Sequence, residues 1–158
     1  MATEQQTSKV TTPSDREIHV ERIFDAPRDL VFAPMTDPEL IPEWFGPPGS
    51  VVDVMEPRAG GLWRFLMDDG KGNEHAFRGV YREVTPPERL VQTFEWEGMP
   101  GHVSVETMTF EDLGEQTRLI SVTLFHTTEE RDGMLESGME GGMNEAFERL
   151  DALLASRK

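Results

Sequence analysis

The sequence predicts an α+β domain in which a curved antiparallel sheet of seven strands packs against one long C-terminal helix. Apolar residues recur at steps of three and four near the end of the chain, which is the spacing of an amphipathic helix. Most of the preceding chain consists of short alternating segments separated by turn residues. Connections this short make neighbouring strands antiparallel, and two short helices are expected between the first and second strands.

The first strand is expected at residues 17–24, where the apolar residues are Ile18, Val20 and then Ile23, with Phe24 shifting the phase. Asp25 is a candidate N-cap for a short helix that Pro34 keeps short. A second short helix is expected to begin near Asp37 and to end near Trp44, before a Gly-Pro-Pro-Gly sequence. Helices of this length are unstable alone and must pack against something larger.

Six further strands follow, each bounded by residues that favour tight turns. They are expected at residues 51–55, 62–67, 76–84, 89–96, 103–111 and 117–125. The acidic segment 68–74 resembles a calcium loop only superficially, because it lacks the alternating carboxylate spacing and the final glutamate. It is predicted to be a hairpin turn.

The C-terminal helix is expected within residues 127–157, with Thr127 as N-cap and acidic residues in the first turn. Gly138, Gly141 and Gly142 interrupt its pattern, and each costs about 1 kcal/mol relative to alanine in a helix interior. The helix therefore either kinks at these glycines or is approached closely by another part of the chain.

Composition excludes several classes of protein. With 158 residues the chain has the size of one domain, and its net charge of −15 argues against binding to nucleic acid or anionic membranes. Without cysteine there is no disulfide or thiolate chemistry, and the scattered histidines predict no metal site and no cofactor. Residues 1–15 are expected to be a disordered tail before a domain at 16–158, with no signal peptide and a cytoplasmic location.

Alternation along the strands predicts that one face of the sheet is strongly aromatic. Leu90, Gln92, Phe94 and Trp96 share one face of their strand. Trp63, Phe65 and Met67 do so on another strand, and Met108 and Phe110 share a face with Ser104 and Glu106 on a third. Such a face is either a filled core or the wall of a ligand cavity.

Several motifs then resemble one family. They are RIFDAP at residues 22–27, WFGP at 44–47, GGLWRF at 60–65, FRGVYREVTPPERL at 77–90, and the glycine-rich start of the last helix. The sequence resembles the SRPBCC or helix-grip (START-like) superfamily, and within it the proteins named after the activator of the heat-shock-protein-90 ATPase. The resemblance implies a sheet that grips the C-terminal helix, with a cavity between them that holds lipids, polyketides or other hydrophobic molecules.

The predicted function is binding of a hydrophobic small molecule in that cavity, without an assigned catalytic residue. The expected ligand-binding residues are Trp44, Phe45, Trp63, Phe65, Phe77, Tyr81, Phe94, Trp96, Met108, Phe110, Met139, Gly142, Met143 and Phe147. Polar residues that could orient a ligand are Arg64, His75, Tyr81, Glu83 and Gln92.

Two alternatives remain open at this point. A cyclase or hydrolase using the same cavity requires an inward polar pair, such as Tyr81 with Glu83 or His75. A module that modulates a chaperone ATPase in a stress response requires an exposed apolar patch instead. The chain has no room for the second domain beside which the eukaryotic namesake's domain works, and both a monomer and a homodimer are compatible with the sequence.

Overall fold

A computed structural model describes residues 8–157 and contains one antiparallel sheet with the strand order β1-β2-β8-β7-β6-β5-β4-β3. The strands are β1 (Lys9–Thr11), β2 (Glu17–Phe24), β3 (Val51–Met55), β4 (Leu62–Asp68), β5 (Glu74–Thr85), β6 (Arg89–Trp96), β7 (Ser104–Asp112) and β8 (Thr117–Leu124). The helices are α1 (Arg28–Thr36), α2 (Ile41–Trp44), α3 (Thr128–Glu136) and α4 (Met139–Arg157). The predicted α+β class is confirmed.

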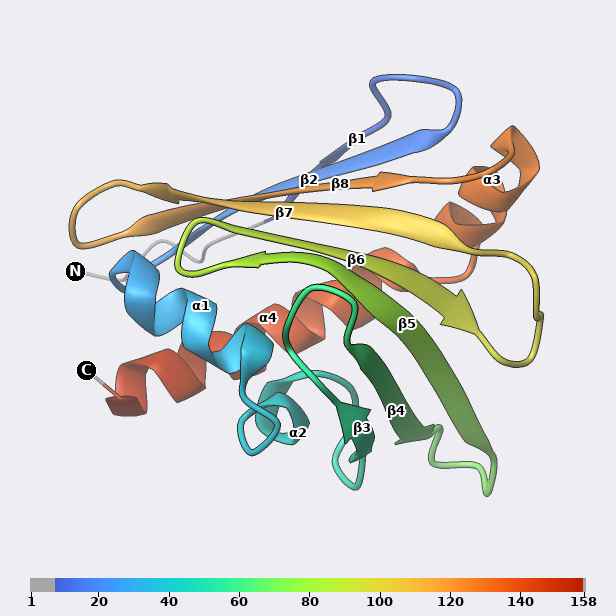
Figure 1. Cartoon of the computed structure of the whole chain (residues 1–158), viewed down its shortest axis with the longest axis horizontal. Helices are drawn as coiled ribbons and strands as arrows, with labels where there is room; N and C mark the ends of the chain where they lie inside the picture. Colours follow the sequence, from blue (N-terminus) through green and yellow to red (C-terminus); the bar gives the residue numbers. More distant parts are fainter. Residues whose placement is uncertain (1–7, 158) are drawn as a thin grey trace.

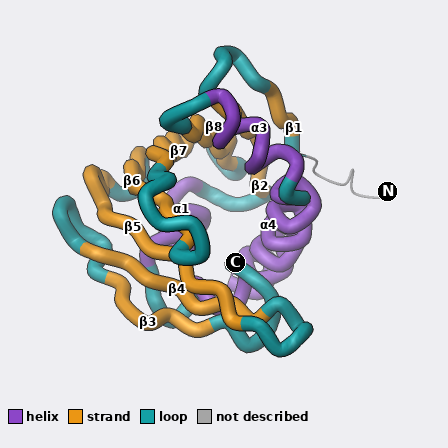
Figure 2. The backbone as a smooth tube through the Cα atoms, turned by 90° about the vertical axis from the view of Figure 1, so that its right-hand side faces the viewer, coloured by secondary structure: helices purple, strands orange, loops and turns teal. Residues whose placement is uncertain are grey.

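The sheet curls around the C-terminal helix. Figure 1 shows α4 running along one face of the sheet, with α1 and α2 toward one end and α3 toward the other. In the perpendicular view the strands form an arc that opens toward α4 (Figure 2). This arrangement gives the sheet an inner face, turned toward α4, and an outer face.

The sheet has eight strands, so the predicted number of seven is wrong. The additional strand β1 lies inside the segment expected to be a tail, and it pairs with β2 so that Val10 stands opposite Val20. Val10 is half-buried against the core, which explains why a polar segment holds a strand there. Residues 1–7 of the predicted tail lie outside the described part of the chain.

The first short helix begins and ends differently from the prediction. Pro27, not Asp25, occupies the N-cap position of α1, and no side chain caps this helix. Pro34 lies inside α1, which continues to Thr36. The Pro34 carbonyl accepts a hydrogen bond of 3.0 Å from the Trp44 indole, so this part of α1 is held by α2.

Glycine breaks the C-terminal helix into two. Gly138 has a φ of +85°, a conformation that glycine adopts without strain, and it separates α3 from α4. The predicted cap of α3 is confirmed: Thr127 accepts a hydrogen bond from the Glu130 amide, and the Glu130 side chain accepts one from the Thr127 amide. A Cβ atom added at Gly141 or Gly142 would meet nothing within 4 Å, so no close approach requires these two glycines.

A buried ion pair fastens α4 to the sheet. Ile18, Val20, Arg22 and Phe24 all point to the inner face of β2, so the predicted phase shift at Phe24 is wrong. The Arg22 side chain is 2% exposed and donates two hydrogen bonds, of 2.8 and 2.6 Å, to the Asp151 carboxylate on α4. Its guanidinium also lies 4.6 Å from the centre of the Phe24 ring.

The core fills the space around the C-terminal half of α4. Phe147 packs edge-on against Phe24, with ring centres 5.2 Å apart, and Leu150 and Leu154 are almost completely buried. Arg149 donates a hydrogen bond of 3.1 Å to the carbonyl of Trp44, which joins α4 to α2. This half of the helix is therefore held by apolar packing and by two arginines.

We predict that Asp151→Asn lowers the free energy of unfolding by about 2 kcal/mol, because it removes the charge of the carboxylate that accepts two hydrogen bonds from the buried Arg22. The loss is smaller than for a fully buried pair, since the Asp151 side chain is 38% exposed. Urea denaturation measures it, with Asp132→Asn as the control because Asp132 forms an exposed pair with Arg131. Equal, small losses in both variants would show that the ion pair does not anchor α4.

Candidate functional site

The strand registers assign side chains to the inner face. Tyr81 stands opposite Gln92, Gln92 opposite Glu106, and Glu106 opposite Thr123. Because residues opposite each other in an antiparallel sheet point to the same side, these four residues form one row across four strands. We call them the polar row.

Aromatic rings cover the inner face on one side of the polar row. Trp63 lies against Phe65 and Phe94, with ring centres 4.7 and 5.9 Å apart, and Phe94 stacks on Phe77 at 5.4 Å. Trp96 follows Phe94 on the same face of β6 and stands opposite Phe77 on β5. The five rings form a continuous aromatic strip from β4 to β6.

One section of the inner face is only partly covered. Phe77, Phe94 and Trp96 are half-buried, as are Gln92 and Glu106 of the polar row. We call these five residues the open section. Met139 and Met143, on the N-terminal half of α4, are also half-buried, whereas Ala146, Phe147, Leu150 and Leu154 on the C-terminal half are buried. The N-terminal half of α4 is thus seated less completely than the C-terminal half.

Glu106 is the acidic residue of the polar row. Its carboxylate accepts a hydrogen bond of 2.7 Å from the Ser121 hydroxyl and a long one of 3.5 Å from the Gln92 amide. Burial raises the pKa of Glu106, and these two neutral donors offset only part of that effect. The side chain nevertheless retains some exposure, as expected for a group on the floor of a concave face.

Tyr81 and Trp63 carry polar atoms that the protein does not satisfy. Within residues 8–157 the Tyr81 hydroxyl makes no hydrogen bond, and burial raises the pKa of this phenol well above its ordinary value. The Trp63 indole nitrogen is buried without a partner among the same residues. It lies against Gly79, where a Cβ atom would collide with the indole and with the Thr93 carbonyl, so only glycine fits beneath this ring.

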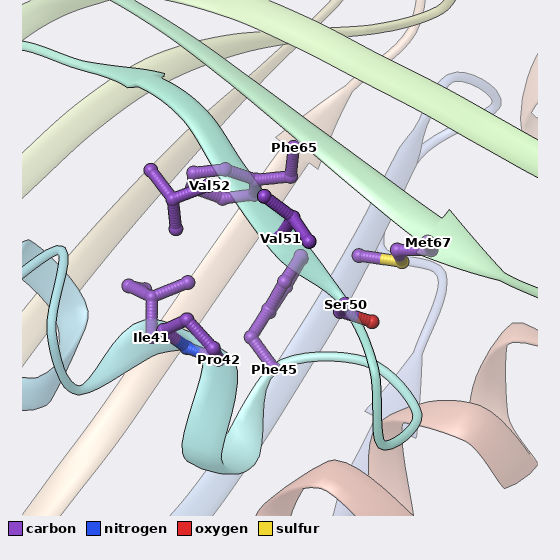
Figure 3. Close-up of a pocket in the computed structure, with 8 residues that line it drawn as sticks. All are labelled: Ile41, Pro42, Phe45, Ser50, Val51, Val52, Phe65 and Met67. Carbon is purple, nitrogen blue, oxygen red and sulfur yellow. The ribbon is translucent and has the colours of Figure 1, made fainter.

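A small apolar pocket lies at the edge of the sheet beside α2. Its walls are Ile41, Pro42, Phe45, Ser50, Val51, Val52, Phe65 and Met67, and it contains about 160 Å³ of empty space, part of which is open to solvent. Figure 3 shows the Phe45 side chain pointing from the end of α2 toward β3. The centre of the Phe45 ring lies 5.4 Å from that of Phe65, which lines this pocket and also belongs to the aromatic strip.

The predicted ligand-binding residues fall into three groups in the structure. Phe45 and Phe65 line the edge pocket. Trp44, Trp63, Tyr81, Met108, Phe110 and Phe147 are buried in the core. Phe77, Phe94, Trp96, Met139 and Met143 are half-buried, and Gly142 is exposed on α4 with open space beside it. The structure brings the aromatic residues of β4, β5 and β6 together, and it leaves Gly142 apart from them.

Three of the polar candidates make other contacts. Arg64 forms ion pairs with Glu97 and Asp53, the former with bonds of 2.7 and 3.0 Å, and lies on the outer face. Glu83 accepts hydrogen bonds from Thr85 and Arg89 and stands opposite Val91, also on the outer face.

His75 is the third of these polar candidates. It pairs with Asp69 at 3.3 Å and lies beside the Trp96 ring. Neither pair proposed for catalysis, Tyr81 with Glu83 or Tyr81 with His75, is hydrogen-bonded within residues 8–157.

Sequence reasoning did not select Glu106, Ser121 or the Arg22–Asp151 pair. The signal for Glu106 was available, because it alternates in phase with Met108 and Phe110 on a strand whose inner residues are apolar. Arg22 shows the same signal between Val20 and Phe24. A charged residue in phase with buried ones predicts a buried charge with a partner, although the partner on α4 is 129 positions away.

The structure is similar to several solved bacterial proteins. A protein from Rhodobacter sphaeroides is 26% identical, with 96% of this chain and 99% of that chain covered and a TM-score of 0.85. A protein from Arthrobacter aurescens is 27% identical, with 94% and 91% covered and the same TM-score. CalU16 from Micromonospora echinospora is 27% identical, with 95% and 85% covered and a TM-score of 0.61. Comparison with curated proteins finds no match.

A family model decides the assignment. The model described as activator of Hsp90 ATPase homolog 1-like protein matches residues 25–155, which is most of the chain. The chain belongs to this family. The Hsp90-activator-like family is part of the SRPBCC superfamily, so the resemblance noted in the sequence is confirmed. As in the helix-grip fold, the sheet curls around a long C-terminal helix, with α1 and α2 following β2.

Two further features concern residues 8–157 of this family member. No helix in this range is long and apolar enough to cross a membrane. No three histidine or acidic side chains there are grouped so that they could hold a metal ion.

We predict that Glu106→Gln becomes more stable relative to the wild type as the pH rises. Because the folded-state pKa of Glu106 is raised above its ordinary value of 4.5, the folded protein keeps this proton where the unfolded chain has lost it. The wild type therefore loses stability from about that pH up to the raised pKa, and the difference between the proteins is constant above it.

Urea denaturation of both proteins across this pH range measures the difference. Carboxylates with lowered pKa values, such as Glu97 and Glu130, destabilise both proteins equally as the pH falls and cancel in the comparison. Glu111→Gln controls for the loss of one glutamate, because Glu111 is on the same strand but exposed. A difference that does not change with pH would contradict the burial of the Glu106 carboxyl.

Proposed function

We propose that the protein binds a hydrophobic small molecule, such as a lipid, a polyketide or an aromatic compound, between the open section and the N-terminal half of α4. The observation that carries this proposal is the partial exposure of Phe77, Phe94 and Trp96 on the inner face. Core packing normally buries such rings completely, and apolar sites for small ligands are lined by this kind of residue.

Covering these rings provides the free energy for binding. Each square ångström of apolar surface removed from water contributes about 25 cal/mol, and an aromatic ligand adds ring contacts of the kind that Phe77 and Phe94 already make. Met139 and Met143 suit the opposite wall, because unbranched methionine side chains adapt to ligands of different shapes.

Binding requires α4 to move away from the sheet. Sites for drug-sized ligands measure about 300 to 1,000 Å³, and the edge pocket, with about 160 Å³, lies beside α2 and β3 rather than between α4 and the open section. Gly138 joins α3 to α4, and Gly141 and Gly142 weaken the first turns of α4. Because the Arg22–Asp151 pair holds the other end of the helix, we expect the N-terminal half alone to shift.

An NMR titration tests this proposal. The purified protein is titrated with palmitate, flavone and anthraquinone, and amide and indole resonances are followed. Binding at the proposed place shifts the indoles of Trp63 and Trp96 and the amides of residues 139–147 saturably. If none of the three compounds causes saturable shifts, the binding function proposed here is wrong.

We predict that Trp96→Ala weakens binding of the best of these compounds at least fivefold, because about 1 kcal/mol of ring contact is lost. The protein should remain folded, since Trp96 is half-buried at the end of β6. Phe147→Ala is the contrasting change: this ring is 8% exposed in the core, so about 3 kcal/mol of stability is lost. Calorimetric titration and thermal melting of both variants separate binding from stability.

A second candidate is an interaction module for a chaperone ATPase, as the family's description suggests. Val54, Leu62 and Val80 are exposed on the outer face, and Leu62 stands opposite Val80 in the register. Such a patch is the feature that this function requires.

The second candidate predicts that the purified protein retains a cytosolic Hsp90-type chaperone in a pull-down, and that Leu62→Gln abolishes this. Val103→Gln is the matched control, because Val103 is an exposed valine far from the patch in the sequence. Equal retention by both variants would exclude the patch as the contact.

A further inference from the structure

The polar row limits the chemistry of a ligand that can lie on the inner face. We propose that Glu106 determines specificity: it selects uncharged ligands that carry a hydrogen-bond-accepting oxygen, on a face that disfavours ligands that carry a carboxylate. This inference rests on the proposed binding function and deepens it, because it concerns the polar part of the ligand rather than its apolar body.

The position of Glu106 places it where a bound ligand would lie. It is on the inner face of β7, opposite Gln92 on β6, and Gln92 is followed on the same face by Phe94 and Trp96. A ring resting on the aromatic strip would therefore extend its substituents toward the polar row. Glu106 and Gln92 retain some exposure at this place, so a ligand can reach both.

The hydrogen bonds inside the row leave capacity for a ligand. One Glu106 oxygen accepts the Ser121 hydroxyl at 2.7 Å, but the other has only the Gln92 amide at 3.5 Å, which is a weak bond. The Tyr81 hydroxyl, opposite Gln92, makes no hydrogen bond with residues 8–157. Unused polar groups in a buried setting cost free energy, and a ligand oxygen that engages them removes this cost.

The charges on this face exclude an anionic ligand. Two basic side chains on the inner face of the described strands already have acidic partners: Arg22 donates two hydrogen bonds to Asp151, and His75 lies 3.3 Å from Asp69. The neighbours that hydrogen-bond to Glu106, Gln92 and Ser121, are neutral. A carboxylate on the ligand would therefore be buried without a free counter-charge, which is unfavourable.

The protonation of Glu106 supports the choice of a hydrogen-bond acceptor. Burial raises the pKa of this carboxyl, which favours its neutral form. A neutral carboxyl has one O–H group to donate, and the oxygen bonded weakly to Gln92 is the one free to carry it. A carbonyl or ether oxygen on the ligand is the matching acceptor.

Three naphthalene derivatives substituted at the same ring position test this proposal. Naphthyl methyl ketone carries a neutral acceptor, naphthoate carries a carboxylate, and ethylnaphthalene carries no polar group. Dissociation constants are measured at neutral pH by NMR titration for the wild type, Glu106→Leu and Glu106→Gln. Glu111→Gln serves as the matched control, because Glu111 is on the same strand but pairs with Arg118 on the outer face.

We expect the wild type and Glu111→Gln to bind the ketone about tenfold more tightly than ethylnaphthalene, as one buried hydrogen bond provides. They should bind naphthoate more weakly than either. Glu106→Leu removes the preference for the ketone, whereas Glu106→Gln keeps it, because the glutamine amide can also donate a hydrogen bond to the ketone oxygen. Thermal melting confirms that each variant is folded.

Two outcomes separate this proposal from the binding function on which it rests. If ethylnaphthalene binds to all proteins and the three ligands keep the same order of affinity in Glu106→Leu, Glu106 has no role in specificity, although the binding function stands. If none of the three compounds shifts the Trp63 or Trp96 indole in any protein, both the binding function and the role of Glu106 are overturned.

Discussion

The ion pair between Arg22 and Asp151 is the constraint on which the rest of the structure depends. A charged group on the inner face of a sheet is stable only with a partner, so α4 must place Asp151 over β2. Phe147 and Leu150 are then brought into the core from the same half of the helix. The three glycines lie at the other end of α4, near its start, and the apolar side chains of that half of the helix are less completely buried.

The inner face is divided in the same way as the helix. Where the inner face lies against the C-terminal half of α4, it is covered by α1, α2 and buried aliphatic and aromatic side chains. Farther along the sheet the rings of Phe77, Phe94 and Trp96 remain half-buried. One curved sheet can hold both a stable core and a ligand-binding surface, because stability comes from one half and the other half can open without disturbing it.

Much of the fold could be predicted from the sequence, because strand alternation and turn residues are local signals. All seven predicted strands lie within two residues of the observed bounds, and the inner face of β4, β6 and β7 was assigned correctly. The features that were predicted wrongly depend on contacts between distant parts of the chain. β1 is a strand because it can pair with β2, and α1 continues through Pro34 because the Trp44 indole uses the Pro34 carbonyl. The aromatic strip could be predicted. The burial of Arg22 and Glu106 could not, because their hydrogen-bond partners, Asp151 and Ser121, lie elsewhere in the sequence.

The polar row shows why the inner face is not simply a core. Buried polar groups with weak or missing hydrogen bonds contribute little to stability, and apolar residues of the same size would pack there without that cost. Glu106, Gln92 and Tyr81 nevertheless stand side by side next to an aromatic strip, with a long hydrogen bond between Gln92 and Glu106 and a Tyr81 hydroxyl that bonds to no side chain of residues 8–157. Arg22 on the same face donates two hydrogen bonds to Asp151, so the sheet can meet the needs of a buried charge where stability requires it. The contrast between these two places is the structural reason for our proposal that a ligand completes the hydrogen bonds of the polar row.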